Sequence, residues 1–197
     1  MNTRPPLLAC AALVLLLPAT AAVAHTAEGV TGGLLSGFTH PIYGWDHVVA
    51  MVAVGLWGAF LGKPALWLLP VIFPLVMALG GALGVAAVPL PSVELFIALS
   101  GVVLGLMVAF AVRAPLWLAA VLVGVFAIFH GHAHGSELPG AANPLAYAVG
   151  FVVATGLLHL AGVGFGFLSR MPFGRPVVRA AGGVIAMIGG AFLFGFA

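Results

Sequence analysis

The amino-acid sequence predicts an all-α, polytopic membrane protein with six transmembrane helices that follow a cleavable signal peptide. Hydrophobic residues make up 63% of the 197 residues and charged residues only 5%, whereas soluble domains carry roughly 25% charged residues. The mean hydropathy of +1.28 and a succession of apolar stretches support the same class, since about 20 apolar residues cross a bilayer as a helix. The expected surroundings are therefore a lipid bilayer. The net charge of +2 gives no reason to expect a nucleic-acid partner.

Residues 1–24 read as a secretory signal peptide that is removed from the mature chain. An arginine supplies the charged beginning, residues 7–17 form an apolar segment too short to span, and residues 22–24 match a small-residue cleavage site. The alternative is that this segment stays attached as a first span. Cys10 is the only cysteine, so residues 25–197 are expected to form one six-helix membrane domain without disulfides or thiolate metal ligands.

Six apolar stretches fill the rest of the chain, and prolines or short polar breaks separate them. We expect transmembrane helices near residues 44–62, 65–86, 92–112, 115–131, 143–168 and 178–196. Segment 28–38 is too short to span. It is expected to be a half-helix or a re-entrant piece at the outer mouth, where its backbone must lie against protein or water.

Glycine is abundant, with 28 residues, and two uses are expected for it. Small residues four apart, such as Gly80 and Gly84, predict that helices pack closely against one another. Gly44, Gly131 and Gly135 lie beside histidines. At these three positions the backbone is expected to bend so that side chains can converge.

The basic residues predict the orientation of the chain. Cleavage after residue 24 would leave the N-terminus outside, and six spans then put Lys63, Arg113 and the basic residues of segment 170–179 on the cytoplasmic side. These are all the basic residues of the mature chain, in agreement with the positive-inside rule. We therefore expect a multi-pass protein of a bacterial cytoplasmic (inner) membrane, with a periplasmic mature N-terminus. The first three and the last three spans would then be related as an inverted repeat.

Two groups of histidines stand out in this apolar sequence. Ionisable residues at or within a membrane are costly and usually functional, and imidazole together with carboxylate suits divalent transition metals. The expected topology puts both groups on the outer face, one at the start of the first span and one at the end of the fourth. The candidate metal ligands are His40, Asp46, His47, His130, His134 and Glu137.

The spacing within the groups predicts how the side chains converge. His130 and His134 are four residues apart and share one helix face, whereas His132 points elsewhere. Pro41 disfavours a continuous helix, so His40 is expected to approach from a bent segment. Two other interpretations stay open, namely helix capping by the aspartate and pH sensing by the second group.

Two further histidines have alternative interpretations. His159 lies in the fifth span, past the bilayer middle, and is either a second station for the ion or a side chain hydrogen-bonded to a neighbouring helix. His25 would become the N-terminal residue after cleavage, where its ring and amino group could bind metal near Glu28. The alternative for His25 is a disordered terminus.

Both histidine groups resemble signatures of one family. Segment His40-Pro-x-x-Gly-x-Asp46-His47 resembles the HPxxGxDH signature of the HupE/UreJ family of nickel permeases, and Phe129-His130-Gly-x-Ala-His134-Gly-x-Glu137 resembles its FHGxAHGxE signature. The resemblance covers the whole chain and implies that the six candidate ligands bind the ion. It implies uptake of Ni²⁺, or of Co²⁺ in some members, for assembly of hydrogenase or urease. A related nickel–cobalt transporter family has a spacing one residue shorter before its Asp-His pair, so the chain is not assigned there.

The resulting hypothesis is passive entry of Ni²⁺ from the periplasm, with Co²⁺ and Zn²⁺ as alternative ions and no prosthetic group. No phosphate-binding loop is recognised in the sequence, so the membrane potential is the expected driving force, at about 2.3 kcal/mol per charge per 100 mV. Uptake is expected to weaken below about pH 6, because protonated imidazole cannot bind metal. The oligomeric state is left open.

Two other classes of function use the same residue types. An intramembrane metal-dependent hydrolase would hold a zinc-bound water on histidines, with Asp46 or Glu137 as the base. A serine hydrolase would instead pair Ser100 with His159. A metal sensor or a scaffold without transport is the third class. We expect the permease and no enzymatic activity.

Overall fold

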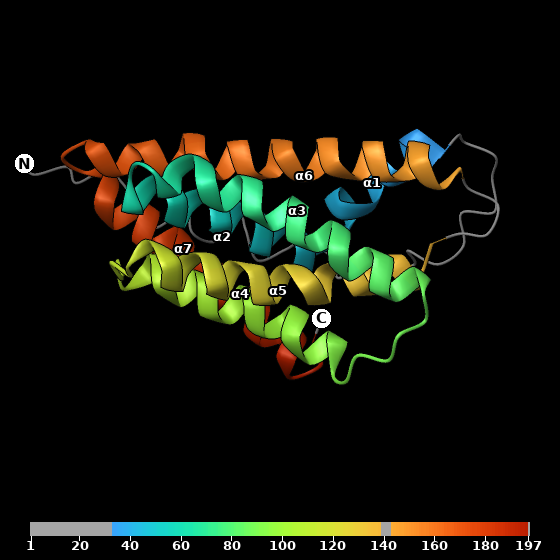
Figure 1. Ribbon diagram of the computed structural model, residues 1–197. Coiled ribbons are helices and arrows are strands. Elements are labelled where there is room, and N and C mark those ends of the chain that lie inside the picture. The colour runs from blue at the N-terminus through green and yellow to red at the C-terminus, as the bar shows by residue number, and fades with distance from the viewer. Residues whose placement is uncertain (1–32, 139–142, 197) are drawn as a thin grey trace, which may run out of the picture.

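The computed structural model describes residues 33–138 and 143–196, so the predicted signal peptide, His25 and Glu28 lie outside the described residues. All regular structure in this part of the chain is helical. The elements are α1 (Gly33–Tyr43), α2 (Trp45–Leu61), α3 (Ala65–Val85), α4 (Val93–Ala109), α5 (Leu116–Ser136), α6 (Pro144–Gly166), the 3-10 helix η1 (Phe167–Arg170) and α7 (Gly174–Leu193). The long helices run side by side in one bundle, and short α1 lies beside α6 near one end (Figure 1).

Four stretches, α3, α5, α6 with η1, and α7, are long and apolar enough to cross a membrane, and the bent pair α1–α2 makes a fifth. Helix α4 is apolar but has only 17 residues. The prediction of an all-helical, multi-pass membrane protein is therefore confirmed. The sixth span, the cleaved signal peptide and the inverted repeat stay predictions.

The boundary of α5 differs from the expected one, because the helix continues past residue 131 to Ser136. The expected bends at Gly131 and Gly135 are wrong. A Cβ atom at Gly131 would overlap the carbonyl oxygen of Met77, and one at Gly135 would overlap that of Gly81. These glycines therefore let α5 pack closely on α3 without leaving the helix. Helix α7 begins and ends earlier than its expected range of 178–196.

The chain does bend at Gly44, where an extended residue separates α1 from α2. The two helices make an angle of 80°, so segment 28–38 is a separate short helix in its described part, as expected, and this helix extends to Tyr43. Helix α1 packs on α6 through glycines, because a Cβ at Gly37 would overlap the Tyr147 carbonyl. The bend therefore carries His40 back across the end of the bundle.

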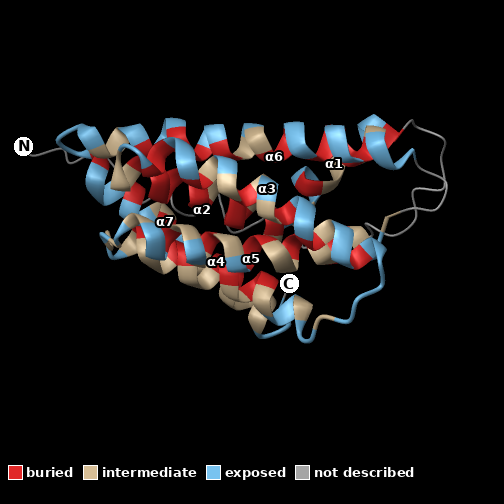
Figure 2. Ribbon diagram, in the orientation of Figure 1, coloured by how far each residue is buried: buried red, intermediate tan, exposed pale blue. Residues whose placement is uncertain are grey.

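Helix α2 lies at the centre of the bundle and contacts α1, α3, α4, α6 and α7. Its side chains are mostly buried, including Met51 and Trp57 with no exposed surface. The outward faces of α3 and α6 instead carry exposed leucines such as Leu79 and Leu160. Figure 2 shows buried residues on the inner faces and exposed ones outside, an arrangement suited to a lipid surround. The inner position of α2 brings its first turn, with His47, within reach of α5.

Candidate metal site

Four histidine rings lie together near the end of the bundle where α1 crosses it. The His47 ring centroid is 4.4 Å from that of His134 and 4.8 Å from that of His130. His40 lies 4.7 Å from His134 and 6.4 Å from His47. The two histidine groups, far apart in the sequence, therefore meet as predicted. We call His40, His47, His130 and His134 the histidine cluster.

Three helices position the histidine cluster. His40 comes from α1, which returns to the bundle end after the bend, and His47 comes from the first turn of α2. His130 and His134 lie one turn apart on α5, so both side chains share one face. Because glycines hold α5 close to α3, that face is fixed against the α2 side of the bundle.

Three rings of the cluster, those of His47, His130 and His134, are removed from water although some of their nitrogens lack partners. His130 has no exposed surface, and His134 and His47 are 6% and 7% exposed. No hydrogen-bond partner is present in the described residues for His47 Nε2, His130 Nδ1 or either ring nitrogen of His134. Leaving a buried polar atom unpaired costs about 1–3 kcal/mol. These nitrogens are therefore expected to meet a partner from outside the chain.

Asp46 fixes the orientation and tautomer of His47. The Nδ1–H group of His47 donates to Asp46 Oδ1 at 2.8 Å, and the backbone N–H of His47 donates to the same oxygen at 2.9 Å. The lone pair of a neutral His47 ring is therefore on Nε2, the buried atom without a partner. Metal-binding histidines commonly donate their other ring N–H to a carboxylate in this way. Gly44 leaves room for the pair, because a Cβ there would come within 3.0 Å of both side chains.

Ser100 of α4 fixes the orientation and tautomer of His130. Its hydroxyl donates to the carbonyl oxygen of Ile97 at 2.6 Å and lies 2.9 Å from His130 Nε2. A serine hydroxyl has one proton, so His130 Nε2–H must be the donor in the second contact. The lone pair of His130 is thus on the unpaired Nδ1 atom. Sequence reasoning missed this role, although a polar residue inside an apolar span is a signal for one.

The same contacts correct the predicted pairing of Ser100 with His159. Ser100 is bonded to His130, and neither ring nitrogen of His159 has a hydrogen-bond partner in the described chain. The serine-hydrolase arrangement is therefore not formed. The interpretation of His159 as a side chain hydrogen-bonded to a neighbouring helix is wrong for the same reason.

Three of the ring centroids are spaced around one point. The sides of the triangle formed by His40, His134 and His47 are 4.7, 4.4 and 6.4 Å, which makes it nearly right-angled at His134. The midpoint of the longest side is about 3.2 Å from all three centroids, and an ion bonded to a ring nitrogen at about 2.0–2.1 Å lies at that distance from the ring centre.

The described side chains around that midpoint do not form a ready-made metal site. Among residues 33–138 and 143–196, no group of three or more His, Cys, Asp or Glu side chains is arranged to hold a metal ion. The His40 ring instead meets the rings of His47 and His134 edge to face, at 83° and 84°. Rotation about the Cβ–Cγ bond turns a ring nitrogen while the centroid hardly moves. Ion binding in the cluster therefore requires rings to rotate in place.

Aromatic side chains of α6 form one wall of the cluster. The Phe151 ring lies 4.3 Å from His134, and the Tyr147 ring lies 6.1 Å from His40, measured between centroids. Both aromatic side chains are 5% exposed. They were not predicted from the sequence, since only the packing of α6 on α1 brings them to the histidines.

Glu137 and His132 do not share in the ring contacts of the histidine cluster. Helix α5 ends at Ser136, so Glu137 caps it and is exposed, and its carboxylate is close enough to Tyr147 for an electrostatic interaction. His132 Nε2–H donates to the Val88 carbonyl at 2.8 Å, away from the cluster as predicted. The ligand role of Glu137 stays a prediction.

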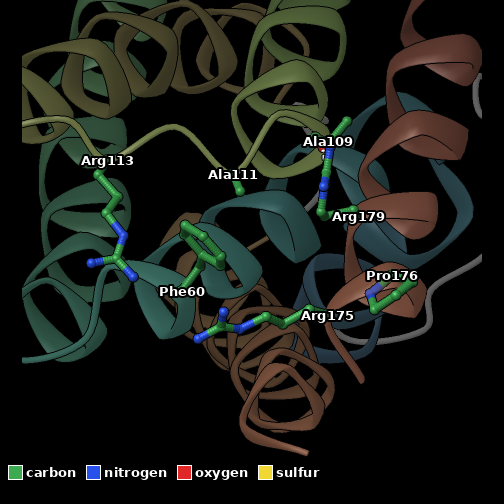
Figure 3. Close-up of a pocket in the computed structure, with 7 residues that line it drawn as sticks. All are labelled: Phe60, Ala109, Ala111, Arg113, Arg175, Pro176 and Arg179. Carbon is green, nitrogen blue, oxygen red and sulfur yellow. Dashed lines mark hydrogen bonds between the residues drawn. The ribbon is translucent and has the colours of Figure 1, made fainter. Parts of the chain in front are cut away.

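The opposite end of the bundle carries arginines instead of histidines. A cavity of about 630 Å³ there is lined by Phe60, Ala109, Ala111, Arg113, Arg175, Pro176 and Arg179 (Figure 3). Arg179 donates to the Ala109 carbonyl at 2.7 Å, and the Arg113 guanidinium lies over the Phe60 ring at 5.9 Å. The positive-inside rule predicts a cytoplasmic location for this end.

Comparison with known proteins identifies the family. The family model described as HupE / UreJ protein matches residues 13–192. Protein HupE of Rhizobium leguminosarum bv. viciae is 47% identical over 174 residues, which cover 88% of this chain and 91% of that protein. No solved structure shows a significant match. The chain therefore belongs to the HupE/UreJ family, as its two histidine signatures predicted.

Proposed function

We propose that the protein is a permease that moves Ni²⁺ passively from the periplasm to the cytoplasm through the histidine cluster. The observation that carries the proposal is the set of buried, unpaired ring nitrogens of His47, His130 and His134. Asp46 and Ser100 hold two of these rings with a lone pair on the free nitrogen. A buried set of neutral donors beside one carboxylate suits a divalent cation.

The proposed path starts with the hydrated ion at the end where α1 crosses the bundle. The negative charge of Asp46 offsets part of the charge of the ion, and imidazole nitrogens replace part of its water shell. Phe151 and Tyr147 exclude other water from that side. Binding must be strong enough to select the ion and weak enough to release it. Imidazole ligands provide the selection, and the water molecules that the ion keeps leave the binding weak enough for release. The membrane potential then draws the ion inward.

The choice of ion rests on the family resemblance. Imidazole and carboxylate ligands suit several divalent transition metals, and the HPxxGxDH and FHGxAHGxE signatures favour Ni²⁺ among them. Co²⁺ is the second candidate ion.

The proposal includes a location and a destination. A bacterial inner-membrane protein with six spans, a removed signal peptide and a periplasmic N-terminus would present the histidine cluster to the periplasm and the arginines to the cytoplasm. Nickel delivered there would supply hydrogenase or urease assembly, which the resemblance of both signatures to nickel permeases implies. Glu137 is proposed as a carboxylate that attracts the ion at the mouth.

Uptake of Ni²⁺ into proteoliposomes tests the proposal. The wild-type protein should move Ni²⁺ down an imposed inside-negative potential without ATP. His40→Ala, His47→Ala and His130→Ala should each reduce the initial rate by about 10- to 100-fold, the range seen when metal sites lose supporting groups. His132→Ala is the matched control, because this ring lies on the same helix but bonds to Val88 instead of the cluster. Unchanged flux in all three variants would end the proposal.

A further inference from the structure

Thr155 and His159 form a second buried polar pair, on α6 and one turn apart. They are 0% and 1% exposed, respectively. Thr155 Oγ1 and both ring nitrogens of His159 have no hydrogen-bond partner within the described part of the chain. A threonine inside a helix usually bonds back to a carbonyl one turn earlier, which this one does not. Three unpaired polar atoms at membrane depth need a partner from outside the chain.

A single aromatic ring separates this pair from the histidine cluster. The Phe73 ring of α3 lies 5.5 Å from the His130 ring and 5.3 Å from the His159 ring, between centroids. Phe73 is fully buried. On the other side α2 and α6 are in close backbone contact, because a Cβ at Gly55 would overlap the His159 carbonyl. The pair is therefore enclosed by α2, α3 and α6, one step inward from His130.

We infer that Thr155 and His159 form an inner station for the same divalent cation, which the ion reaches after leaving the histidine cluster past Phe73. This inference rests on the proposed permease function. The station offers one imidazole and one hydroxyl, and the described acidic residues, Asp46, Glu94 and Glu137, lie on other helices or in the α5 cap. It therefore binds a partly hydrated ion weakly.

Weak inner binding lets the ion leave the station, while the membrane potential sets the direction of flow. Multi-site conduction requires each site to let the ion leave, and a station with fewer donors releases its ion more readily than the cluster does. The apolar Phe73 ring between the two sites limits water continuity, as hydrophobic constrictions in other channels do. The inner station would thus set the maximal rate, and the cluster would set the apparent affinity.

Two variants of near-native shape test the inner station. His159→Leu keeps the space filled with an apolar side chain, and Thr155→Val is isosteric. With Ni²⁺ alone as the probe, the initial rate at saturating Ni²⁺ should fall at least tenfold in His159→Leu and severalfold in Thr155→Val. The half-saturating concentration should stay within twofold. Leu160→Ala, a neighbouring residue 53% exposed on the outer face of α6, should match the wild type.

Equilibrium binding of radioactive Ni²⁺ to the purified full chain separates the two proposals. The wild type should bind two ions at high concentration and His159→Leu one. If the wild-type protein transports Ni²⁺ and both variants match it in rate and in the number of bound ions, the inner station is overturned and the permease proposal stands. Absent wild-type flux together with loss of one bound ion in His159→Leu overturns the permease and supports the station. If His159→Leu fails to fold, Thr155→Val decides on the rate alone.

Discussion

The two ends of the bundle treat their polar groups in opposite ways. At the arginine end the side chains are exposed, and two of the guanidinium groups have partners: the Ala109 carbonyl for Arg179 and the Phe60 ring for Arg113. At the histidine end the rings of His47, His130 and His134 are buried, and the nitrogens of His134 have no partner within the described residues. By the positive-inside rule, the arginine end is expected to orient the chain in the membrane. The end with unpaired nitrogens is the one that we propose binds the ion.

The comparison also explains why the histidine end tolerates unpaired atoms. Close packing of α5 on α3 and of α6 on α1 fixes the backbone around the cluster, since glycines at each contact leave no room for a Cβ. Each unpaired atom destabilises the fold by about 1–3 kcal/mol, and helix packing elsewhere in the bundle offsets this loss. Close glycine packing is present at the arginine end as well, at Gly174 and Gly182, but there the polar side chains are exposed to water.

The largest effect is expected from Gly131→Ala. The new Cβ would overlap the Met77 carbonyl and push α5 from α3, which carries His130 and His134 away from His47. Uptake of Ni²⁺ should be abolished and stability should fall by about 1–3 kcal/mol, measured by thermal unfolding in detergent. Gly156→Ala is the control, because nothing lies within 4 Å of its Cβ position. Equal transport by the two variants would show that the α3–α5 contact does not position the site.

Asp46→Ala should have the next largest effect. Without its carboxylate the His47 ring loses the acceptor that keeps the lone pair on Nε2, and loss of such a partner typically costs 10–100-fold in metal affinity. Calorimetric titration with Ni²⁺ should show this weakening. Asp46→Asn should lose less, because its amide oxygen can still accept the Nδ1–H proton. If both variants bind as the wild type does, orientation by Asp46 is not required.

Ser100→Ala should have a smaller but clear effect. The substitution leaves His130 Nε2–H buried without its acceptor. This should lower the free energy of unfolding by about 1–3 kcal/mol, and the ring is then free to turn. We expect a lower melting temperature and a severalfold slower uptake. The matched control is Ser136→Ala, whose hydroxyl bonds to Ala133 in its own helix. A normal rate in Ser100→Ala would argue against the assigned His130 tautomer.

Arg179→Ala should have the smallest effect. Its bond to the Ala109 carbonyl is solvent-exposed, and such a bond contributes about 0.5–1.5 kcal/mol. The uptake rate should stay within a factor of two when the fraction of correctly oriented protein is equal, as measured by protease access from one side of the vesicle. A loss of transport as large as that of Asp46→Ala would erase the distinction between the two ends.

Much of the architecture follows from the sequence, because a helix that crosses lipid must consist of a long run of apolar residues. Apolar runs separated by prolines predicted α2, α3, α4 and α6 within a few residues. The helical spacing of His130, His132 and His134 predicted which ring turns away. The meeting of the two histidine groups followed from an expected topology that puts both at one face.

The remaining features depend on contacts that no local pattern encodes. Sequence alone did not show that α5 extends to Ser136, because the glycines that suggested a bend are used for packing on α3. The position of Glu137 at the cap follows from that extension. The bond from His130 to Ser100 depends on how α4 and α5 are placed. The unpaired state of His159 becomes visible only when all neighbouring helices are known.

The most direct test of the central claim is X-ray absorption at the nickel edge on purified protein loaded with one equivalent of Ni²⁺. The account predicts at least three imidazole nitrogens at about 2.0–2.1 Å, with one or more lost from the spectra of His47→Ala and of His134→Ala. A coordination sphere of oxygen atoms alone, or a histidine signal unchanged in both variants, would contradict it.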